Sequence, residues 1–409
     1  MGGDGAMRDF NAELHARPSL YFSGLAIIDH VSISRPHIAI ADFGTTGAGF
    51  GRLPESGISY SVERHAEFVS VTTLAPLTAE PLHWPHAPAN WLAIPGLAAL
   101  ADDDVVCRIR ILVCPGRASL GLDDLEAYGL RQAAGSLIGG GDAIVVSDFV
   151  VSDFVVENGV SRILLFNGTL NEYRLGRMVR RLCEIETYRS MSLKGLPIAR
   201  DLAPVLVEYD AELTSLADRH IAVEGSQHRN LLADVTQLSA RIVSDTSKTR
   251  NRFGATAAYA RIVEDRIAEL REARLPGFQR YGVFIDRRFR PAVRTCAATA
   301  SRLEQMATAA NHLIEILQTR IQVAVQDQNR EQLELLARRA ETQVRIQRSV
   351  EGLSAIAIGY YLIGLIKICI DSLQHAGIAV PDYAMLVAVP IALIATVLAV
   401  VSLKRVLSK

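Results

Sequence analysis

Residues 353–370 read LSAIAIGYYLIGLIKICI, an apolar run of eighteen residues with a single charge at Lys367. Residues 383–403 read YAMLVAVPIALIATVLAVVSL and carry no charge. Because about 20 helical residues cross a bilayer core of roughly 30 Å, both runs are long enough to span a membrane. The stretch that joins them is polar and only twelve residues long. The sequence therefore predicts a transmembrane hairpin over residues 351–409.

Charged residues on both sides of the hairpin predict its orientation. Basic residues flank its two open ends, with Arg338, Arg339, Arg345 and Arg348 before the first run and Lys404, Arg405 and Lys409 after the second. The positive-inside rule then places both ends of the hairpin in the cytoplasm. The polar N-terminal segment has no apolar core of a signal peptide, so we expect the rest of the chain to be cytosolic.

Small residues on the first run are candidates for helix packing or for lining a pore. Gly352, Ala355 and Gly359 form a stripe that lets another helix approach closely, and Ser354 lies beside it. The neighbouring helix is either the second run or the same run of another subunit. The sequence does not choose between these alternatives.

Polar side chains within the first run need a separate explanation. Tyr360 and Tyr361 lie deeper than interfacial aromatic residues, so their hydroxyls need partners inside a bundle, or they line a pore. We interpret Lys367 as a snorkelling residue that pairs with Asp371 four positions later. The alternative is a functional charge within the membrane.

The part before the hairpin changes from a β pattern to a helical one, so the predicted fold class is α+β. Strands are expected over 26–35, 37–43, 58–74, 105–113, 142–151 and 161–168, with a helix over 122–137. The segment VVSDF occurs twice in tandem over 145–154, and a bulge or longer hairpin should absorb the second copy. This β-rich α/β part forms a predicted domain over residues 1–170.

A helical region is predicted over residues 171–350. Helices are expected from 175 to about 195, where Gly195 and Pro197 end the run, from about 200 to 246, and from 255 to 274, where RLPGFQRYG interrupts the pattern. From about 284 to 348, apolar steps of three and four residues suggest a long helix or helix pair with coiled-coil character. This stalk should continue without a break into the first apolar run.

Composition and motifs exclude several classes of function. The net charge is −1, which argues against nucleic acid as a partner. The cysteines (Cys107, Cys114, Cys183, Cys296 and Cys369) are scattered and contain no CxxC pair, as expected for reduced thiols rather than disulfides or a zinc site. His83 and His86 fall in a proline-rich loop without further metal ligands. We therefore expect no metal and no cofactor.

The glycine-rich segment FGTTGAGFGRL, residues 43–53, lacks the Lys-Ser/Thr of a phosphate-binding loop and is interpreted as a flexible turn. No common hydrolase or protease motif stands out. The sequence therefore predicts a protein that is not an enzyme.

Three polar segments remain. The ligand-binding candidates in the first two, NAELHARP (11–18) and ERHAEF (63–68), are Glu13, His15, Arg17, Glu63, His65 and Glu67. Glu63, His65 and Glu67 alternate along a predicted strand and should share one face, either solvated or buried against a partner such as Arg17. In the third segment, Arg180 and Glu184 have the i, i+4 spacing of a structural ion pair on a helix.

With ELHARP and ERHAEF, the segments GRMVRRLCEIETYRSM (176–191), FIDRRFRPAVRTC (284–296), LQTRIQVAVQDQNREQLELLARRA (317–340) and QRSVEGLSAIAIGYYLIGL (347–365) carry a family resemblance. The chain resembles a family of bacterial membrane-anchored proteins known as a domain of unknown function. The resemblance implies a multi-pass protein of the bacterial inner membrane and supplies no activity.

The overall plan is also distantly similar to that of CorA-type divalent cation transporters. In those, a Gly-Met-Asn signature follows the first span, whereas Asp371, Ser372 and Leu373 follow it here. This difference argues against magnesium transport, and the similarity is one of architecture.

These features are compatible with three functions. We expect an anchored homo-oligomer in the lipid bilayer that binds a partner or ligand. The alternative is a CorA-like channel for a divalent cation, and a membrane-tethered enzyme using Glu63, His65 and Arg17 is the least favoured reading.

Overall fold

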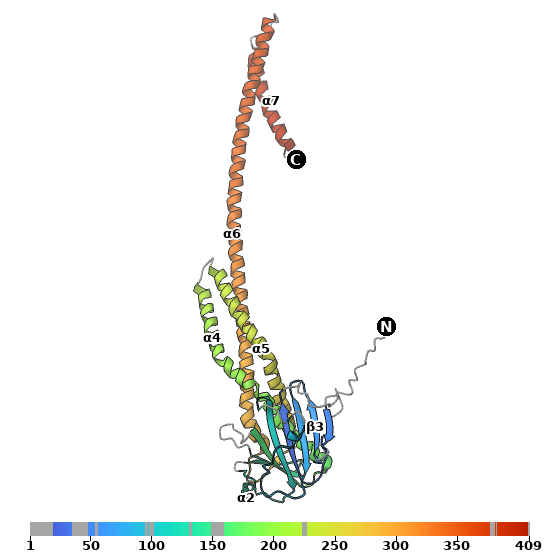
Figure 1. Ribbon diagram of the computed structural model, residues 1–409. Helices are drawn as coiled ribbons and strands as arrows, with labels where there is room; N and C mark the ends of the chain where they lie inside the picture. Colours follow the sequence, from blue (N-terminus) through green and yellow to red (C-terminus); the bar gives the residue numbers. More distant parts are fainter. Residues whose placement is uncertain are drawn as a thin grey trace, which may run out of the picture. The chain divides into compact units, whose positions relative to one another are not determined.

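The computed structural model describes residues 19–34, 48–53, 56–94, 97, 102–130, 133–148, 159–222, 227–376, 381 and 383–407. The chain divides into two compact units, one of residues 1–222 and 230–314 and one of residues 223–229 and 315–409. The helices before residue 314 therefore group with the sheet. The α+β fold class, with a β-rich N-terminal part and a long C-terminal helix, is confirmed (Figure 1).

The first unit is built on a nine-stranded sheet with the order β2-β3-β4-β1-β5-β8-β7-β6-β9. The strands are β1 (Ala26–Ile33), β2 (Ala48–Arg52), β3 (Ser59–Arg64), β4 (Val69–Pro76), β5 (Val105–Pro115), β6 (Ala134–Ile138), β7 (Ala143–Asp148), β8 (Val160–Asn167) and β9 (Ala273–Arg274). Strands β5 and β8 are parallel, and the other neighbours in this order are antiparallel. Two short 3₁₀ helices, η1 (Asn90–Ala93) and η2 (Asp102–Asp104), precede β5.

Two predicted elements of the sheet need correction. The segment 58–74 is not one strand, because the backbone NH of His65 donates to the carbonyl of Phe68 (2.8 Å) and turns the chain between β3 and β4. Residues 48–52 of the glycine-rich segment are not a flexible turn, because they form the edge strand β2. Gly51 is required there, since a Cβ at this position would collide with the ring of Tyr60.

The helix predicted over 122–137 is also too long. The structure has a short helix α2 (Leu122–Glu126), after which Gly129 adopts a positive φ of 68° and the chain enters β6. The strand predicted over 37–43 lies outside the described residues. The first copy of VVSDF ends β7 at Asp148, and the second copy also lies outside them.

Helices α3 (Glu172–Leu193), α4 (Gly195–Ala222), α5 (His228–Glu269) and α6 (Tyr281–His375) follow the sheet. The predicted break between 246 and 255 is wrong. An apolar stripe through Ile242, Phe253 and Ala260 continues across it, within a single helix α5 that begins at His228. Within the first unit, α4, α5 and the start of α6 lie side by side (Figure 1).

Both faces of the sheet are covered by apolar side chains. On one face, Leu175, Leu182 and Ile185 of α3 pack with the sheet and with Tyr281 at the start of α6. On the other face, the core includes Trp84 and Leu125 of α2. Strand β5 contributes to both cores because its side chains alternate.

The second unit contains the rest of α6 and helix α7 (Ala384–Leu407), which turns back beside α6 (Figure 1). The prediction that one helix continues into the first apolar run is confirmed. Among the described residues, α6 is the one helix long and apolar enough to cross a membrane, and the apolar part of α7, Leu386–Ser402, is shorter. In this single chain, residues 322–350 are exposed on all sides of α6.

The residues singled out in the first apolar run differ in their surroundings. A Cβ at Gly359 would lie 3.8 Å from Leu393 of α7, so this glycine faces the second helix, whereas nothing lies near Gly352. Ser354 donates to the carbonyl of Val350 (2.8 Å).

The polar residues of this run are exposed in the single chain. Tyr360 and Tyr361 are 76% and 72% exposed. The predicted pair between Lys367 and Asp371 is not formed within the described residues. A cation placed four residues before an anion is the less favourable order on a helix.

Candidate functional site

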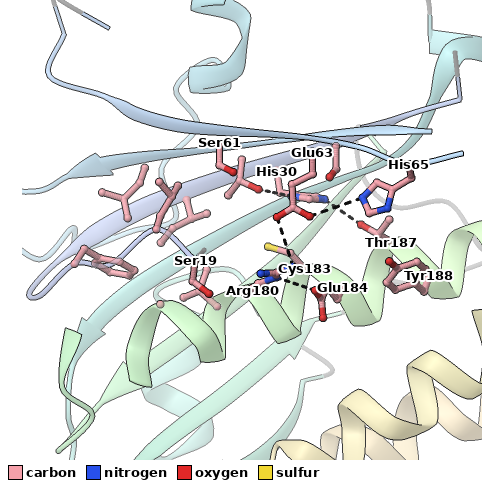
Figure 2. A pocket seen from close by; sticks show the side chains of 18 of the residues that line it. Ser19, His30, Ser61, Glu63, His65, Arg180, Cys183, Glu184, Thr187 and Tyr188 are labelled. Carbon is pink, nitrogen blue, oxygen red and sulfur yellow. Dashed lines mark hydrogen bonds and ion pairs between the residues drawn. The ribbon is translucent and has the colours of Figure 1, made fainter. Parts of the chain in front are cut away.

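A pocket in the first unit lies between the sheet and α3 (Figure 2). Strands β1, β3 and β4 line one side and α3 lines the other, while Ser19, Leu20 and Phe22 line it as well. Its inner volume is about 50 Å³. Because charged, hydroxyl and apolar side chains converge on this small space, it is the candidate ligand site of the chain.

Strand and helix periodicities explain how the lining residues reach the pocket. Ser61 and Glu63 are two residues apart on β3 and face the same side of the sheet. Arg180, Glu184 and Tyr188 are four residues apart on α3 and share one helix face. The segments ERHAEF and EIETYR, far apart in sequence, therefore meet here.

Charged side chains form one end of the pocket (Figure 2). The Glu63 carboxylate lies between His65 Nε2, at 3.8 Å, and Arg180 Nη2, at 3.6 Å. These separations are longer than hydrogen bonds and are suited to bridging by a water or a ligand atom. The predicted pair of Arg180 with Glu184 is present at 2.8 Å. Glu184 also pairs with Arg266 of α5, so this ion pair belongs to a larger network.

Aromatic contacts hold His65 in place. Its ring stacks on Phe68 at 4.0 Å and meets the edge of Tyr188 at 6.3 Å. Glu67 is not among the residues that line the pocket, because β3 ends at Arg64 and the chain turns before Glu67. Glu67 instead pairs with Arg252 of α5.

Hydroxyl groups surround a buried histidine, His30, which also lines the pocket. Its Nδ1 lies 2.8 Å from Thr72 Oγ1, and its Nε2 lies 3.0 Å from Thr187 Oγ1 and 3.1 Å from Ser32 Oγ. Burial, together with the nearby His65, lowers the pKa of His30 to about 3. The imidazole is therefore neutral at physiological pH.

A buried ion pair lies on the same helix, α3. Glu186 is fully buried, accepts from Arg189 at 2.7 Å, and receives hydrogen bonds from Ser161 and Tyr281 at 3.3 Å. Because these groups join α3, β8 and α6, their role is to fix the helix against the sheet. They hold the pocket in shape.

The thiols near the pocket are unreactive. Cys183 lines it, and burial raises the pKa of this thiol well above its usual range. Burial also raises the pKa of Cys107, which lies 3.6 Å from Thr187 Oγ1. Since the thiolate is the nucleophile, neither cysteine is activated at neutral pH.

Sequence reasoning found one part of this site and missed another. It identified Glu63, His65 and the Arg180–Glu184 pair, whereas Glu13, His15 and Arg17 lie outside the described residues. It missed His30, Thr72 and Thr187. The available signal for His30 was a polar pair, His30 and Ser32, on one face of an otherwise apolar strand.

No group of three or more His, Cys, Asp or Glu residues in the described part of the chain is arranged to hold a metal ion. The profile of a protein family described as "Protein of unknown function (DUF3422)" matches residues 6–407. No curated protein matches the chain.

Proposed function

We propose a function from the geometry of the chain itself, because the chain belongs over residues 6–407 to the DUF3422 family, a family of unknown function. We propose a membrane-anchored protein whose cytosolic body binds a small polar molecule in the α3 pocket. The observation that carries this proposal is the Glu63 carboxylate, held 3.6–3.8 Å from Arg180 and His65 at the end of a pocket. A ligand group placed there would exchange hydrogen bonds with the side chains of Glu63, Arg180 and His65.

The charges around the pocket indicate the class of ligand. The carboxylates of Glu63 and Glu184 and the guanidinium groups of Arg180 and Arg266 belong to one network of ion pairs, which also includes Glu269 of α5. A ligand with a net charge would disturb this network in a partly desolvated site. We therefore propose an uncharged or zwitterionic molecule with a hydrogen-bonding head and a short apolar body, which Phe22 and Leu74 would contact.

Binding is favoured over catalysis by the state of the candidate nucleophiles and bases. His30 is neutral, but hydroxyl groups occupy both of its ring nitrogens. Cys183 is held as a thiol. A general base needs a ring nitrogen that can reach the proton it removes, and hydroxyl groups engage both nitrogens of His30. Neither residue supports an enzymatic role.

The ligand site is tested by thermal-shift screening of the detergent-solubilised full chain with polyols, amino acids and betaines. A compound of this class should stabilise the wild type. Replacing Glu63→Gln should weaken its binding by about tenfold or more, because hydrogen bonds to a charged group contribute about 1.5–3 kcal/mol. The matched control is Glu212→Gln, which breaks an exposed ion pair with Arg241. The proposal would be contradicted if the Glu63→Gln variant bound the compound as tightly as the wild type, or if no compound of this class stabilised the wild type.

The membrane anchor is tested by placing arginines on the two apolar helices. The double variant Ile358→Arg/Leu398→Arg alters exposed positions within the proposed spans, and Ile346→Arg/Leu335→Arg alters exposed positions outside them. An arginine at the centre of a span costs about 2.5–3.5 kcal/mol on insertion scales. After an alkaline carbonate wash, the first variant should leave the membrane pellet and the second should remain. Full retention of the first variant would argue against insertion.

A CorA-like cation channel is our second proposal, and it requires a ring of subunits. It is favoured by the continuity of α6, which extends without interruption from Tyr281 to His375. The mass of the solubilised protein, corrected for detergent, tests it. A pentamer would support a pore, whereas a monomer or dimer would exclude one, because a single hairpin per subunit cannot enclose an axis.

A further inference from the structure

We propose that residues 322–350 of α6 form the surface through which a second copy of the chain packs against the first, with the two helices parallel. In the single chain every residue of this segment is exposed, over a helix length of about 43 Å. Helices in proteins gain most of their stability from packing one face against a neighbour, and no other described part of the chain covers this segment. A partner is therefore needed to cover it.

One side of the segment carries no charge. A helix turns by about 100° per residue, so the sequence places each side chain around the helix axis. Within an arc of about 120°, which we call the uncharged face, all side chains are apolar or amides. They are Val325, Leu333, Leu336, Ala340, Val344 and Val350, with Gln322, Gln326, Asn329, Gln332, Gln343 and Gln347. The charged residues of the segment lie outside this arc and are Asp327, Arg330, Glu331, Glu334, Arg338, Arg339, Glu341, Arg345 and Arg348.

The charged side of the segment is suited to water. Arg330 Nε lies 3.3 Å from the Glu334 carboxylate, and Arg345 Nη2 lies 3.0 Å from that of Glu341. Both are exposed pairs with the i, i+4 spacing of a solvated helix surface. On the uncharged face, by contrast, Leu333 is 65% exposed. The uncharged face is therefore the side that gains from being covered.

The amide side chains indicate that the partner is the same face of another copy. In a parallel contact between identical helices, residues at the centre of the face meet their own counterparts. An amide both donates and accepts, so Asn329 or Gln343 can form a hydrogen bond with the same residue of the other copy. A carboxylate only accepts and a guanidinium only donates, so a charged residue could not pair with its own counterpart. A face made of apolar and amide side chains alone meets this requirement.

The spacing along the uncharged face keeps such a contact continuous. Steps of 11 residues lead from Val325 to Leu336 and on to Gln347, and from Leu333 to Val344. An 11-residue repeat corresponds to about 3.67 residues per turn, close to the 3.6 of a straight helix. Two copies can therefore remain in contact along the whole segment with only a slight right-handed supercoil.

The parallel direction rests on the membrane anchor proposed above. Helix α6 continues without a break from this segment into the apolar run that begins at residue 353. Two copies with the same topology enter the membrane from the same side, so their α6 helices run in the same direction. Residues with the same number then lie side by side.

Disulfide cross-linking of the full chain in membranes tests the contact. Each new cysteine is combined with Cys369→Ser, which removes the one exposed cysteine of the described residues. Leu336→Cys lies on the uncharged face, and Arg338→Cys lies on the charged side. A disulfide needs two Cα atoms within about 7 Å, so mild oxidation should link two copies through Leu336→Cys and at least ten times less through Arg338→Cys. No linked dimer from Leu336→Cys, or equal amounts from both variants, would overturn the proposal.

The direction of the copies is tested by expressing Val325→Cys and Val344→Cys together, with tags of different length. The two positions are about 29 Å apart along the helix. Parallel copies should link each variant only to itself. A product that joins Val325→Cys to Val344→Cys would show antiparallel copies and overturn the proposal.

Two adjacent leucines provide matched variants. Leu336→Glu places like charges within the uncharged face and should lower cross-linking through Val325→Cys at least tenfold. Leu335→Glu changes a residue that is 52% exposed and lies about 100° away around the helix, so it should leave cross-linking unchanged. Equal effects of the two variants would overturn the proposal.

The alkaline carbonate wash separates this contact from the membrane anchor. A chain that stays in the membrane but gives no dimer through Leu336→Cys would contradict the contact alone. A chain that forms this dimer but leaves the membrane would contradict the anchor alone.

Discussion

Replacing Arg110→Met is expected to lower the free energy of unfolding by about 3–5 kcal/mol, the cost of breaking a buried ion pair by removing one partner. Asp29 is almost completely buried, so its carboxylate would lose the guanidinium and keep its charge. Three backbone carbonyls, of Pro85, Ala87 and Pro88, would lose their donor at the same time. Urea denaturation followed by tryptophan fluorescence measures the loss, because Trp84 and Trp91 lie beside this pair.

Two further variants separate the buried charge from other effects of the substitution. Arg261→Met removes an exposed arginine and should change stability by less than about 0.5 kcal/mol. The double variant Asp29→Asn/Arg110→Met buries no unpaired charge and should recover part of the loss. If the double variant is no more stable than Arg110→Met, the cost lies in the carbonyls rather than in the charge of Asp29.

Acidification is expected to destabilise the first unit through His30. The pKa of His30 is about 3 in the folded protein, because burial disfavours its charged form, and about 6.5 in an unfolded chain. Between these values the unfolded state binds more protons, so stability is complete above about pH 6.5 and falls with decreasing pH. The slope is about 1.4 kcal/mol per pH unit, or about 5 kcal/mol over the whole window.

The measurement is urea denaturation at several values between pH 7 and pH 4, for the wild type and for His30→Gln. The variant is less stable at pH 7, since it loses contacts with Thr72 and Thr187, but its stability should depend less on pH. His83→Gln changes an exposed histidine and should keep the wild-type slope. Parallel curves for the wild type and His30→Gln would mean that His30 does not carry this pH dependence.

Local patterns in the sequence predicted much of the secondary structure. Alternation and β-branched residues identified β5 and β8, and helical spacing identified α3 and the unbroken α6. The errors arose where a local pattern conflicted with the tertiary structure. The glycine-rich segment was predicted to be a flexible turn, but its residues 48–52 form strand β2. The lack of a side chain on the glycines lets this edge strand lie against Tyr60.

The candidate site was predictable only as separate pieces. Spacing on one helix gave the pair of Arg180 and Glu184, since residues four apart on a helix are always neighbours. The contact of Glu63 with Arg180 joins residues far apart in the chain, so no local spacing reports it. His30 was invisible for the same reason, because its partners Thr72 and Thr187 come from another strand and from α3.

Arg110 donates hydrogen bonds to the loop that contains residues 85–88, and these bonds constrain the loop in an unusual way. Surface loops commonly accept insertions and deletions, because little depends on their backbone. Here one guanidinium must reach the carbonyls of residues 85, 87 and 88 together. This loop should therefore tolerate changes of side chain at its exposed positions, but a change of length by even one residue would take a carbonyl out of reach.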